Sequence, residues 1–360
     1  MSIGIAGAGL LGRLLAFQLA HRGHAVHVFD PAPNAEARGA AGWTAAGMLS
    51  PVAELESADE GVFRLGLRSM ELWPGILARL EVPVEFRCDG SLLLAHRGDE
   101  GAARRVVDLL ARKMEALDPR LRGNDAMVIP AQAGTQGVEG MAPQALSIQQ
   151  LGDLEPAVRG PGNAWLLPHE GRIHTVQAMQ ALATATRVVH WHWGHGIEQA
   201  SPHTLRTVDA THRFDHVFDV RGTGARPQMP VRGVRGEIFW LQAPGLALTR
   251  PLRLLHPRHR VYIVPRGPDL VIVGASEIES EDRSPVSVRS TVELLAAAHS
   301  VVPELAEARI VHSETNLRPA LPDNLPRIEA EAGLTRINGL FRHGWLIAPA
   351  LVEQAIEDLA

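Results

Sequence analysis

Three glycines and one aspartate near the start of the chain have the residue types and spacing that dinucleotide binding requires. Gly7, Gly9 and Gly12 form the pattern GxGxxG. The first glycine permits a tight turn, the second lets the backbone approach a pyrophosphate, and the third allows a helix to pack closely on a strand. Asp30 follows at the separation at which an acidic residue accepts hydrogen bonds from a ribose. The pattern predicts a dinucleotide site but does not distinguish NAD from FAD.

These residues can act together only if the chain around them forms a strand, a turn, a helix and a second strand. Residues 3–6 are an apolar run typical of a buried strand. Residues 10–21 predict an apolar helix that ends at Gly23, and residues 25–29 predict the second strand. The first helical residues, Leu10 and Leu11, then present free N–H groups and the positive end of the helix dipole to the phosphates.

The composition is that of a globular enzyme. The chain has 360 residues, which suggests two domains or one large composite fold. The formal net charge is -5, so nothing favours nucleic acid or an anionic membrane as a partner. No apolar run approaches membrane-spanning length and the N-terminus lacks the features of a signal peptide, so we expect a cytoplasmic protein.

The run HWHWGH, at residues 190–195, is the one segment that suggests a metal site. On a strand, His190 and His192 would share a face, as metal ligands do. The alternative is a strand that carries amphipathic rings. Because no third ligand or carboxylate lies nearby in sequence, we expect the strand and no metal.

Three further stretches decide between NAD and FAD. They are GAAGWTAAGMLSP at 39–51, TNLRPALPDNLPRI at 315–328 and NGLFRHGWLIAPA at 338–350. With the N-terminal unit, they make the chain resemble the D-amino-acid-oxidase-like family of FAD enzymes, and within it the glycine oxidases of thiamine biosynthesis. The resemblance covers nearly the whole chain. It implies FAD, held non-covalently because Cys88 is expected to pack in a strand, and it argues against an NAD-dependent dehydrogenase.

The resemblance also implies which residues surround the flavin. Small residues of the first stretch would pass beside the isoalloxazine ring, and a strand residue would contact the adenine side through its backbone. A glycine turn within residues 215–225 would return to FAD. The last helix would begin at the flavin, where its dipole stabilises negative charge on the reduced ring. The residues implied are Ala46, Gly47, Met48, Val188, Gly222, Arg342, His343, Gly344, Trp345, Leu346 and Ile347.

By the same resemblance, Arg318 and Arg342 would bind the carboxylate of a substrate, because a planar guanidinium pairs with a carboxylate through two hydrogen bonds. Tyr262, the only tyrosine in the chain, would donate its hydroxyl to the same carboxylate. No general base is required if the amine binds in its neutral form, since its lone pair assists the departure of the α-hydrogen.

Two positions depart from the family pattern. Arg260 stands where the resemblance suggests a histidine, and Glu277 stands where a methionine is expected. These departures leave the ranking of substrates open. Glu277 would either counter a substrate ammonium group or lie at a solvated strand end.

The expected architecture is α/β, with a Rossmann-like FAD-binding domain that contains a parallel sheet and a smaller α+β substrate domain that contains a mainly antiparallel sheet. The first domain is expected to comprise residues 1–80, 148–226 and 311–360, and the second residues 81–147 and 227–310. Alternating patterns predict strands of the second domain within 84–95 as a strand pair, at 236–244, and as a hairpin at 260–276.

The expected activity is FAD-dependent oxidative deamination of glycine or a similar small amino acid or amine. Its products would be the imine or glyoxylate, ammonia and hydrogen peroxide, with oxygen as the electron acceptor, in the supply of the thiazole moiety of thiamine. The alternatives are an oxidase or dehydrogenase for sarcosine or a D-amino acid, an NAD-dependent dehydrogenase, and an inactive flavoprotein. We also expect a homo-oligomer.

Residues 118–137 do not fit this family pattern. They are rich in proline and glycine, show no sustained period, and contain no residue that suggests chemistry. The segment resembles an inserted repeat, and an active-site lid is the alternative.

We therefore predict that a deletion that joins Leu117 to Val138 still folds, binds FAD and turns over substrate. A surface insertion changes the free energy of folding little, because the cost of closing a loop rises by only about 0.6 kcal/mol for each doubling of loop length. Flavin absorbance and steady-state kinetics of the purified deletion variant check this. Normal folding with lost activity would indicate a lid instead.

Overall fold

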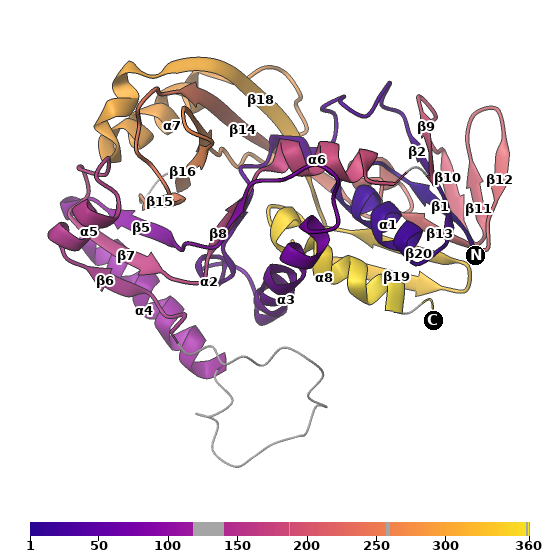
Figure 1. The fold of residues 1–360 in the computed structure, drawn as a ribbon, viewed down its shortest axis with the longest axis horizontal. Coiled ribbons are helices and arrows are strands. Elements are labelled where there is room, and N and C mark those ends of the chain that lie inside the picture. The colour runs from indigo at the N-terminus through magenta and orange to yellow at the C-terminus, as the bar shows by residue number, and fades with distance from the viewer. Residues whose placement is uncertain (118–139, 187, 257–259, 358, 360) are drawn as a thin grey trace, which may run out of the picture.

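The computed structural model describes residues 1–117, 140–186, 188–256, 260–357 and 359. The predicted insertion at 118–137 lies outside these residues. Two large sheets dominate the part that is described, and both termini lie beside the first of them (Figure 1). None of the described helices is both long and apolar enough to cross a membrane.

The first sheet has six strands and is parallel except at one edge. In spatial order its strands are β19 (Arg327–Glu331), β20 (Leu334–Asn338), β13 (His216–Asp219), β1 (Ser2–Ala6), β2 (Ala25–Asp30) and β9 (Val189–Trp193). β19 alone pairs in antiparallel fashion. The predicted strand–turn–helix–strand unit is confirmed, because α1 (Leu10–His21) joins β1 to β2 and Gly23 follows the helix at φ +82.

The second sheet has eight strands and is antiparallel except between β15 and β5. In spatial order its strands are β18 (Arg309–Ala320), β14 (Arg232–Gln242), β17 (Leu270–Gly274), β16 (Arg260–Arg266), β15 (Leu252–Leu255), β5 (Ser91–Ala95), β7 (Asn163–Leu167) and β6 (Gln144–Leu146). One parallel and one mainly antiparallel sheet confirm the predicted α/β fold class. The predicted hairpin is formed by β16 and β17.

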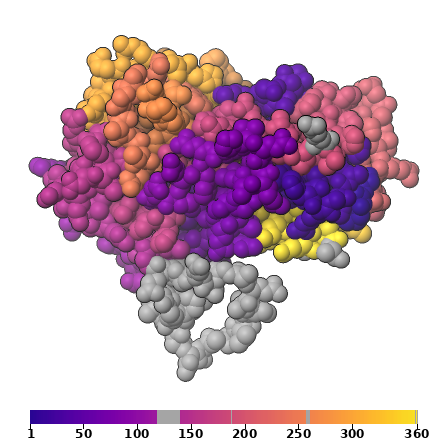
Figure 2. Space-filling view, viewed as in Figure 1, coloured from indigo at the N-terminus to yellow at the C-terminus, as the bar shows by residue number. Residues whose placement is uncertain are grey.

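Helices and small sheets complete the fold. α8 (Gly344–Glu357) packs against both α1 and α3 (Glu60–Leu77), and its apolar side chains join a core that includes Phe17 and Trp73. In Figure 2 the segment that contains α3 crosses the visible face between the two halves of the molecule. The remaining elements are η1 (Ala41–Thr44), β3 (Met48–Leu49), α2 (Pro51–Glu54), β4 (Phe86–Arg87), η2 (Arg97–Asp99), α4 (Glu100–Leu117), α5 (Ile148–Leu154), β8 (Gly171–Ile173), α6 (Thr175–Thr184), β10 (Gln199–Ser201), β11 (Thr204–Arg206), β12 (Thr211–Arg213), η3 (Gly222–Ala225), α7 (Val288–Val301) and η4 (Pro303–Glu307).

One strand prediction was wrong in its pairing. Residues 84–95 were expected to form a strand pair, but β4 pairs with β8 in a small sheet and β5 pairs with β7 and β15 in the large one. The chain turns between the two sheets at Gly90, whose φ of +88 favours glycine. β7 and β18 also belong to the eight-stranded sheet, so we propose that the substrate domain extends into residues 163–167 and 309–320.

The histidine-rich run forms β9, as the strand interpretation predicted. His190 and His192 both stack on His27 of the neighbouring strand, with ring centroids 4.7 and 5.4 Å apart. His192 also stacks on Phe29. No group of three or more potential ligands with metal-site geometry occurs among the described residues. Burial, followed by the neighbouring histidines, lowers the pKa of both His27 and His192.

This cluster predicts a loss of stability in mild acid. The pKa values of these histidines are lower in the folded protein than in the unfolded chain. As the pH falls through about 6.5, the ordinary histidine value, the unfolded chain therefore binds more protons than the folded protein does. The free energy of unfolding should therefore decrease between pH 7.5 and pH 5. Denaturant titrations at several pH values should show a smaller decrease for His192→Asn than for the wild type, whereas the exposed control His299→Asn should follow the wild type. If the free energy of unfolding changes equally with pH in all three proteins, the loss of stability in acid does not arise from this histidine cluster.

Candidate functional site

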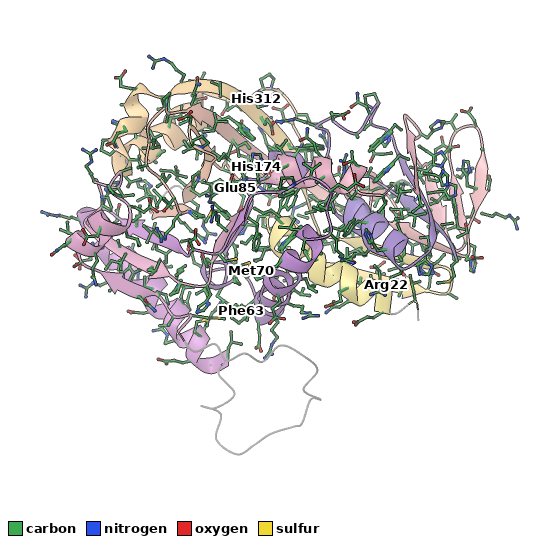
Figure 3. All side chains as sticks on the ribbon, viewed as in Figure 1. Arg22, Phe63, Met70, Glu85, His174 and His312 are labelled. Carbon is green, nitrogen blue, oxygen red and sulfur yellow. The ribbon has the colours of Figure 1, made fainter. Side chains whose placement is uncertain are left out.

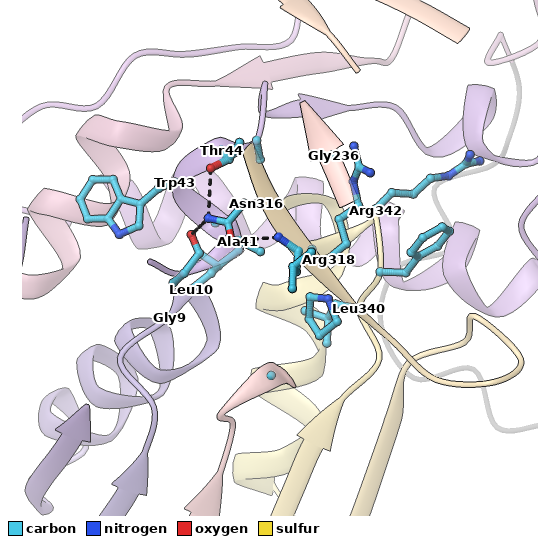
Figure 4. A pocket seen from close by; sticks show the side chains of 18 of the residues that line it. Gly9, Leu10, Ala41, Trp43, Thr44, Gly236, Asn316, Arg318, Leu340 and Arg342 are labelled. Atoms are coloured by element: carbon cyan, nitrogen blue, oxygen red, sulfur yellow. Dashed lines mark hydrogen bonds between the residues drawn. The ribbon is translucent and has the colours of Figure 1, made fainter. Parts of the chain in front are cut away.

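A cavity of about 1140 Å³ is lined by residues of both large sheets. This volume exceeds the roughly 300–1,000 Å³ usual for sites of drug-sized ligands, so it offers room for a dinucleotide and a small substrate together. The parallel sheet contributes the carboxyl ends of β1 and β2, and the second sheet contributes β16 and β18. Figure 4 shows Gly9 and Leu10 on one side of the cavity and Arg318 and Arg342 on the other. The cavity therefore lies where ligands bind in open α/β sheets.

The glycine-rich turn lies at one end of this cavity. Gly7 has φ +104, and a side chain there would come within 2.8 Å of the Val220 carbonyl oxygen. Gly9, Leu10 and Leu11, which were predicted to bind the cofactor, line the cavity. Gly12 does not line it; a Cβ at Gly12 would lie 1.9 Å from the Gly7 carbonyl oxygen, which is the close helix–turn packing that the pattern requires.

The N-terminus of α1 is available to an anion. The helix has no side-chain cap and no acidic residue in its first turn, so its first N–H groups and its dipole act on the cavity without competition from the helix itself. Asp30 stands beside this turn at the end of β2. Its carboxylate accepts hydrogen bonds from Ala8 N at 2.6 Å and Ala32 N at 2.8 Å, which fixes both the turn and the acid at the edge of the cavity.

A buried arginine that the sequence patterns did not single out supports this end. Arg13 donates to the carbonyl oxygens of Ala8 at 2.8 Å, Met179 at 2.6 Å and Ala35 at 2.8 Å. Its guanidinium carbon lies 5.2 Å from the centroid of the Trp43 ring. Burial lowers the pKa of Arg13 to about 10, so it stays a cation at neutral pH. It thus ties the glycine turn to α6 and adds positive charge next to the predicted phosphate site.

The predicted flavin loop forms the middle of the cavity wall. Ala46, Gly47 and Met48 all line the cavity. Gly47 has φ +70, and a Cβ there would lie 2.2 Å from the Ile173 carbonyl oxygen, so neither the conformation nor the space admits a side chain. Gly222 of η3 also lines the cavity and accepts a hydrogen bond from Asn338.

Arg266 fixes this loop through hydrogen bonds to the backbone. It is almost completely buried, and its guanidinium donates to the carbonyl oxygens of Ala46 and Ile173. Burial, with the like charge of Arg172 nearby, lowers the pKa of Arg266 to about 9. The group therefore remains positive at neutral pH and joins the loop to β8.

A second group of charges surrounds Arg266. Glu85 pairs with Arg172, and Glu85 lies close to His174 (Figure 3). Burial and the Arg266 cation lower the pKa of His174 to about 4, so this histidine is neutral at neutral pH. The positive charge under the loop therefore resides on the two arginines rather than on the imidazole.

The start of α8, which was predicted to contact the flavin, lies at the cavity. Arg342, His343, Gly344, Trp345 and Leu346 all line it. The helix has no acidic residue in its first turn. His343 Nδ1 is buried and, within the described part of the chain, has no hydrogen-bond partner; such an orphaned atom is a candidate contact for a ligand.

Besides Gly12, two further predicted cofactor residues do not line the cavity. Ile347 lies one position further along α8 and packs in the core. Val188 precedes β9 and is exposed, at the end of the sheet where β2 begins. The carboxyl ends of parallel strands carry the site, so the amino end of β9 is at the wrong edge. The part of this segment that does line the cavity is Trp193, Gly196 and Ile197.

Tyr262 and Arg318 lie together at the other end of the cavity. Both are half-buried and line it, and the Arg318 cation acts on the Tyr262 phenol. Burial nevertheless raises the pKa of Tyr262, which keeps the hydroxyl protonated and able to donate. Gly236 and Gly274 make the space: a Cβ at Gly236 would lie 2.5 Å from Arg318 Cζ, and one at Gly274 would lie 2.8 Å from the Tyr262 hydroxyl oxygen.

Arg318 has no carboxylate within ion-pair distance among the residues that the structure describes. Its guanidinium donates to the carbonyl oxygens of Ser276 at 3.0 Å and Arg235 at 3.3 Å. Burial lowers its pKa, and Tyr262 and Glu277 oppose that effect. A desolvated cation without an anionic partner in the protein is suited to an anionic ligand.

Arg342 differs from Arg318, although both were predicted to bind substrate carboxylate. It forms ion pairs with Glu54 at 2.8 Å and with Glu277 at 3.6 Å. Glu54 also contacts His343 Nε2 at 2.9 Å. Burial alone would raise the pKa of Glu54, but the His343 hydrogen bond and the Arg342 cation lower it well below its ordinary value. Arg342 is thus neutralised by the protein's own carboxylates, which argues against the second clamp.

The sequence patterns missed several residues that build the site. Glu54 had no signal in the sequence. Arg13 directly follows the glycine pattern and Arg266 begins the predicted hairpin turn, but neither position indicated a buried cation. Asn316 on β18 donates to the Thr44 hydroxyl at 3.1 Å and to the Ala40 carbonyl oxygen at 3.2 Å (Figure 4). It ties the second sheet to η1, next to the glycine turn.

These features fit a dinucleotide cofactor with a flat ring. The uncapped α1, the carboxylate of Asp30 and the cation of Arg13 suit pyrophosphate and ribose. The tight Gly47 loop offers backbone at close range, as a planar ring needs. Cys88 lies at an exposed position away from the cavity, so it offers no covalent attachment.

Comparison with known proteins agrees with this geometry. The DAO family profile, described as FAD dependent oxidoreductase, matches residues 2–357. A protein of Rhizobium etli, named as the thiamine biosynthesis oxidoreductase ThiO, is 34% identical over 363 residues, covering 100% of this chain and 96% of that protein. A glycine oxidase of Geobacillus kaustophilus is 25% identical, covering 96% of this chain and 89% of its own. The crystal structure of glycine oxidase from that organism superposes with a TM-score of 0.79 at 24% identity, over 99% of this chain and 93% of the other, which supports the fold.

The contacts of Arg266 predict a role in holding FAD. Arg266→Met should leave the carbonyl groups of Ala46 and Ile173 without donors, at a cost of roughly 1–3 kcal/mol for a buried unsatisfied group, and should loosen the loop at the ring. We expect weaker binding of FAD to the apoprotein, measured by quenching of flavin fluorescence, and a lower midpoint of unfolding. The exposed control Arg104→Met should bind FAD like the wild type; equal FAD affinity of all three proteins would show that the loop does not depend on Arg266.

Proposed function

Because this chain belongs to the DAO family of FAD-dependent oxidoreductases, we propose that it oxidises the amine of a small amino acid, with glycine as the leading substrate. It is an FAD-dependent amine oxidoreductase, which decides against the NAD-dependent alternative. The names of the relatives support glycine as substrate and thiamine biosynthesis as the setting.

The observation that carries the proposal is the Arg318 guanidinium beside the Tyr262 hydroxyl, desolvated and without an ion-pair partner in the part of the chain that the structure describes. Arg318 supplies the positive charge and Tyr262 a neutral donor for one carboxylate. Both project from the second sheet into the cavity whose other end holds the dinucleotide pattern. A small amino acid bound by its carboxylate would therefore present its α-carbon toward the cofactor end of the cavity.

The residues of the chain contribute binding, orientation and exclusion of water. When bound, FAD supplies the two-electron acceptor for the hydrogen that leaves the α-carbon. Arg318 and Tyr262 fix the carboxylate, which removes the entropy cost of aligning the α-carbon during the reaction. The half-buried wall around them limits water. Glycine then becomes its imine, which water hydrolyses to glyoxylate and ammonia.

Other parts of the assignment stay predictions. Sarcosine and D-amino acids carry the same carboxylate and remain alternative substrates. Oxygen as the acceptor, with hydrogen peroxide as its product, is expected from the family resemblance. Non-covalent binding of FAD, a cytoplasmic location and a homo-oligomeric state also remain expectations.

The carboxylate clamp can be tested by mutation. Arg318→Ala removes a charge-assisted partner and should weaken amino acid binding by roughly 2–5 kcal/mol. Tyr262→Phe removes one hydrogen bond to a charged group and should cost roughly 1.5–3 kcal/mol. The measurement is anaerobic stopped-flow reduction of the flavin by glycine, sarcosine and D-alanine, with FAD content checked in each variant.

Arg327→Ala, which removes an exposed arginine on β19, serves as the matched control and should react like the wild type. If Arg318→Ala reduces its flavin with glycine at wild-type affinity, the clamp is misassigned. If none of the three amino acids reduces the wild-type flavin, the substrate class is wrong.

A further inference from the structure

The substrate end of the cavity contains more charge than a single carboxylate clamp needs. Arg253, Arg260, Arg318 and Arg342 are among the arginines that line the cavity, and three of these four have carboxylate partners in the protein. Arg253 and Arg260 both pair with Glu56, at 2.8 and 3.4 Å. Arg342 lies between Glu54 and Glu277. Within the described residues, Arg318 is the arginine of this group of four that has no ion pair, so it is the member of the group whose charge is open to a substrate carboxylate.

Glu277 is the more exposed of two carboxylates of this network that line the cavity, and Glu54 is the other. Glu54 has three partners, since it contacts Arg342, His343 and Arg253. Within the described residues, Glu277 forms one ion pair, the long one to Arg342, and its side chain is 48% exposed. Its charge also acts on Arg318. Glu277 therefore lies near the carboxylate-binding position with a side chain that is about half exposed.

We propose that Glu277 is a specificity-determining residue that limits the substrate to amino acids with a single carboxylate. The inference rests on the proposed amine oxidation at this site. A second carboxylate on the substrate would meet the like charge of Glu277, and it would find Arg342 already neutralised by Glu54. A neutral substrate amine does not meet this repulsion. The site therefore discriminates against dicarboxylic amino compounds chiefly by repulsion.

The test uses matched pairs of ligands that differ by one carboxylate. Acetate and malonate report binding without turnover, through the change in flavin absorbance of the holoenzyme. Glycine and iminodiacetate, which is glycine with an N-carboxymethyl arm, report kcat/KM. The wild type should favour the monocarboxylate in both pairs. Glu277→Gln, which keeps the size of the side chain, should shift both preferences toward the dicarboxylate by tenfold or more.

Glu279→Gln is the matched control. Glu279 lies two residues away, pairs with Arg232, and does not line the cavity, so its substitution removes the same charge and should leave both preferences unchanged. Glu277→Ala provides a second variant, with the same expected shift, if Glu277→Gln loses FAD.

The outcomes separate this inference from the proposed function. Unchanged acetate-to-malonate and glycine-to-iminodiacetate preferences in both Glu277 variants would overturn the role of Glu277, even if glycine reduces the flavin normally. If the acetate-to-malonate preference shifts in the Glu277 variants but no amino acid reduces the flavin, the repulsion by Glu277 is supported and amine oxidation is overturned. An equal shift in Glu279→Gln would show a general charge effect and would also overturn the inference.

Discussion

Backbone carbonyl groups, rather than carboxylates, hold the positive charges on which the cavity depends. Arg13, Arg266 and Arg318 are desolvated, and each donates to two or more carbonyl oxygens from other segments. A carbonyl dipole orients a guanidinium without cancelling its charge, so the positive charge persists at these three places. The wall of the cavity is therefore positive at its glycine turn, beneath its central loop and at its substrate end, which suits an anionic cofactor and an anionic substrate together.

Hydrogen bonds from the antiparallel sheet also position the segments that line the middle of the cavity. Arg266 belongs to β16 of that sheet, and its acceptors lie in the loop after η1 and in β8 of a small sheet. Asn316 of β18 reaches η1 beside the glycine turn. The position of the flat-ring loop therefore depends on side chains that the antiparallel sheet supplies.

Local sequence patterns predicted those parts of the site that consist of residues close together in the sequence. The turn from Gly7 to Gly12, the helix after it and Asp30 all form a contiguous unit, and the hairpin around Tyr262 has clear turn chemistry. The pairing of β4 with β8 depends on contacts between residues far apart, and so does the edge of the sheet at which Val188 lies. The partners of Arg342 could not be inferred either, because Glu54 and Glu277 converge on it only in the folded chain.

The cavity draws its lining from the start, the middle and the end of the chain, so no single segment can bind the cofactor by itself. Occupancy and folding are consequently linked by mass action: a ligand at a hundred times its dissociation constant stabilises the native state by about 2.7 kcal/mol. A cell short of flavin would therefore hold more of this chain in states open to proteases. The abundance of the enzyme, as well as its turnover, would follow the supply of its cofactor.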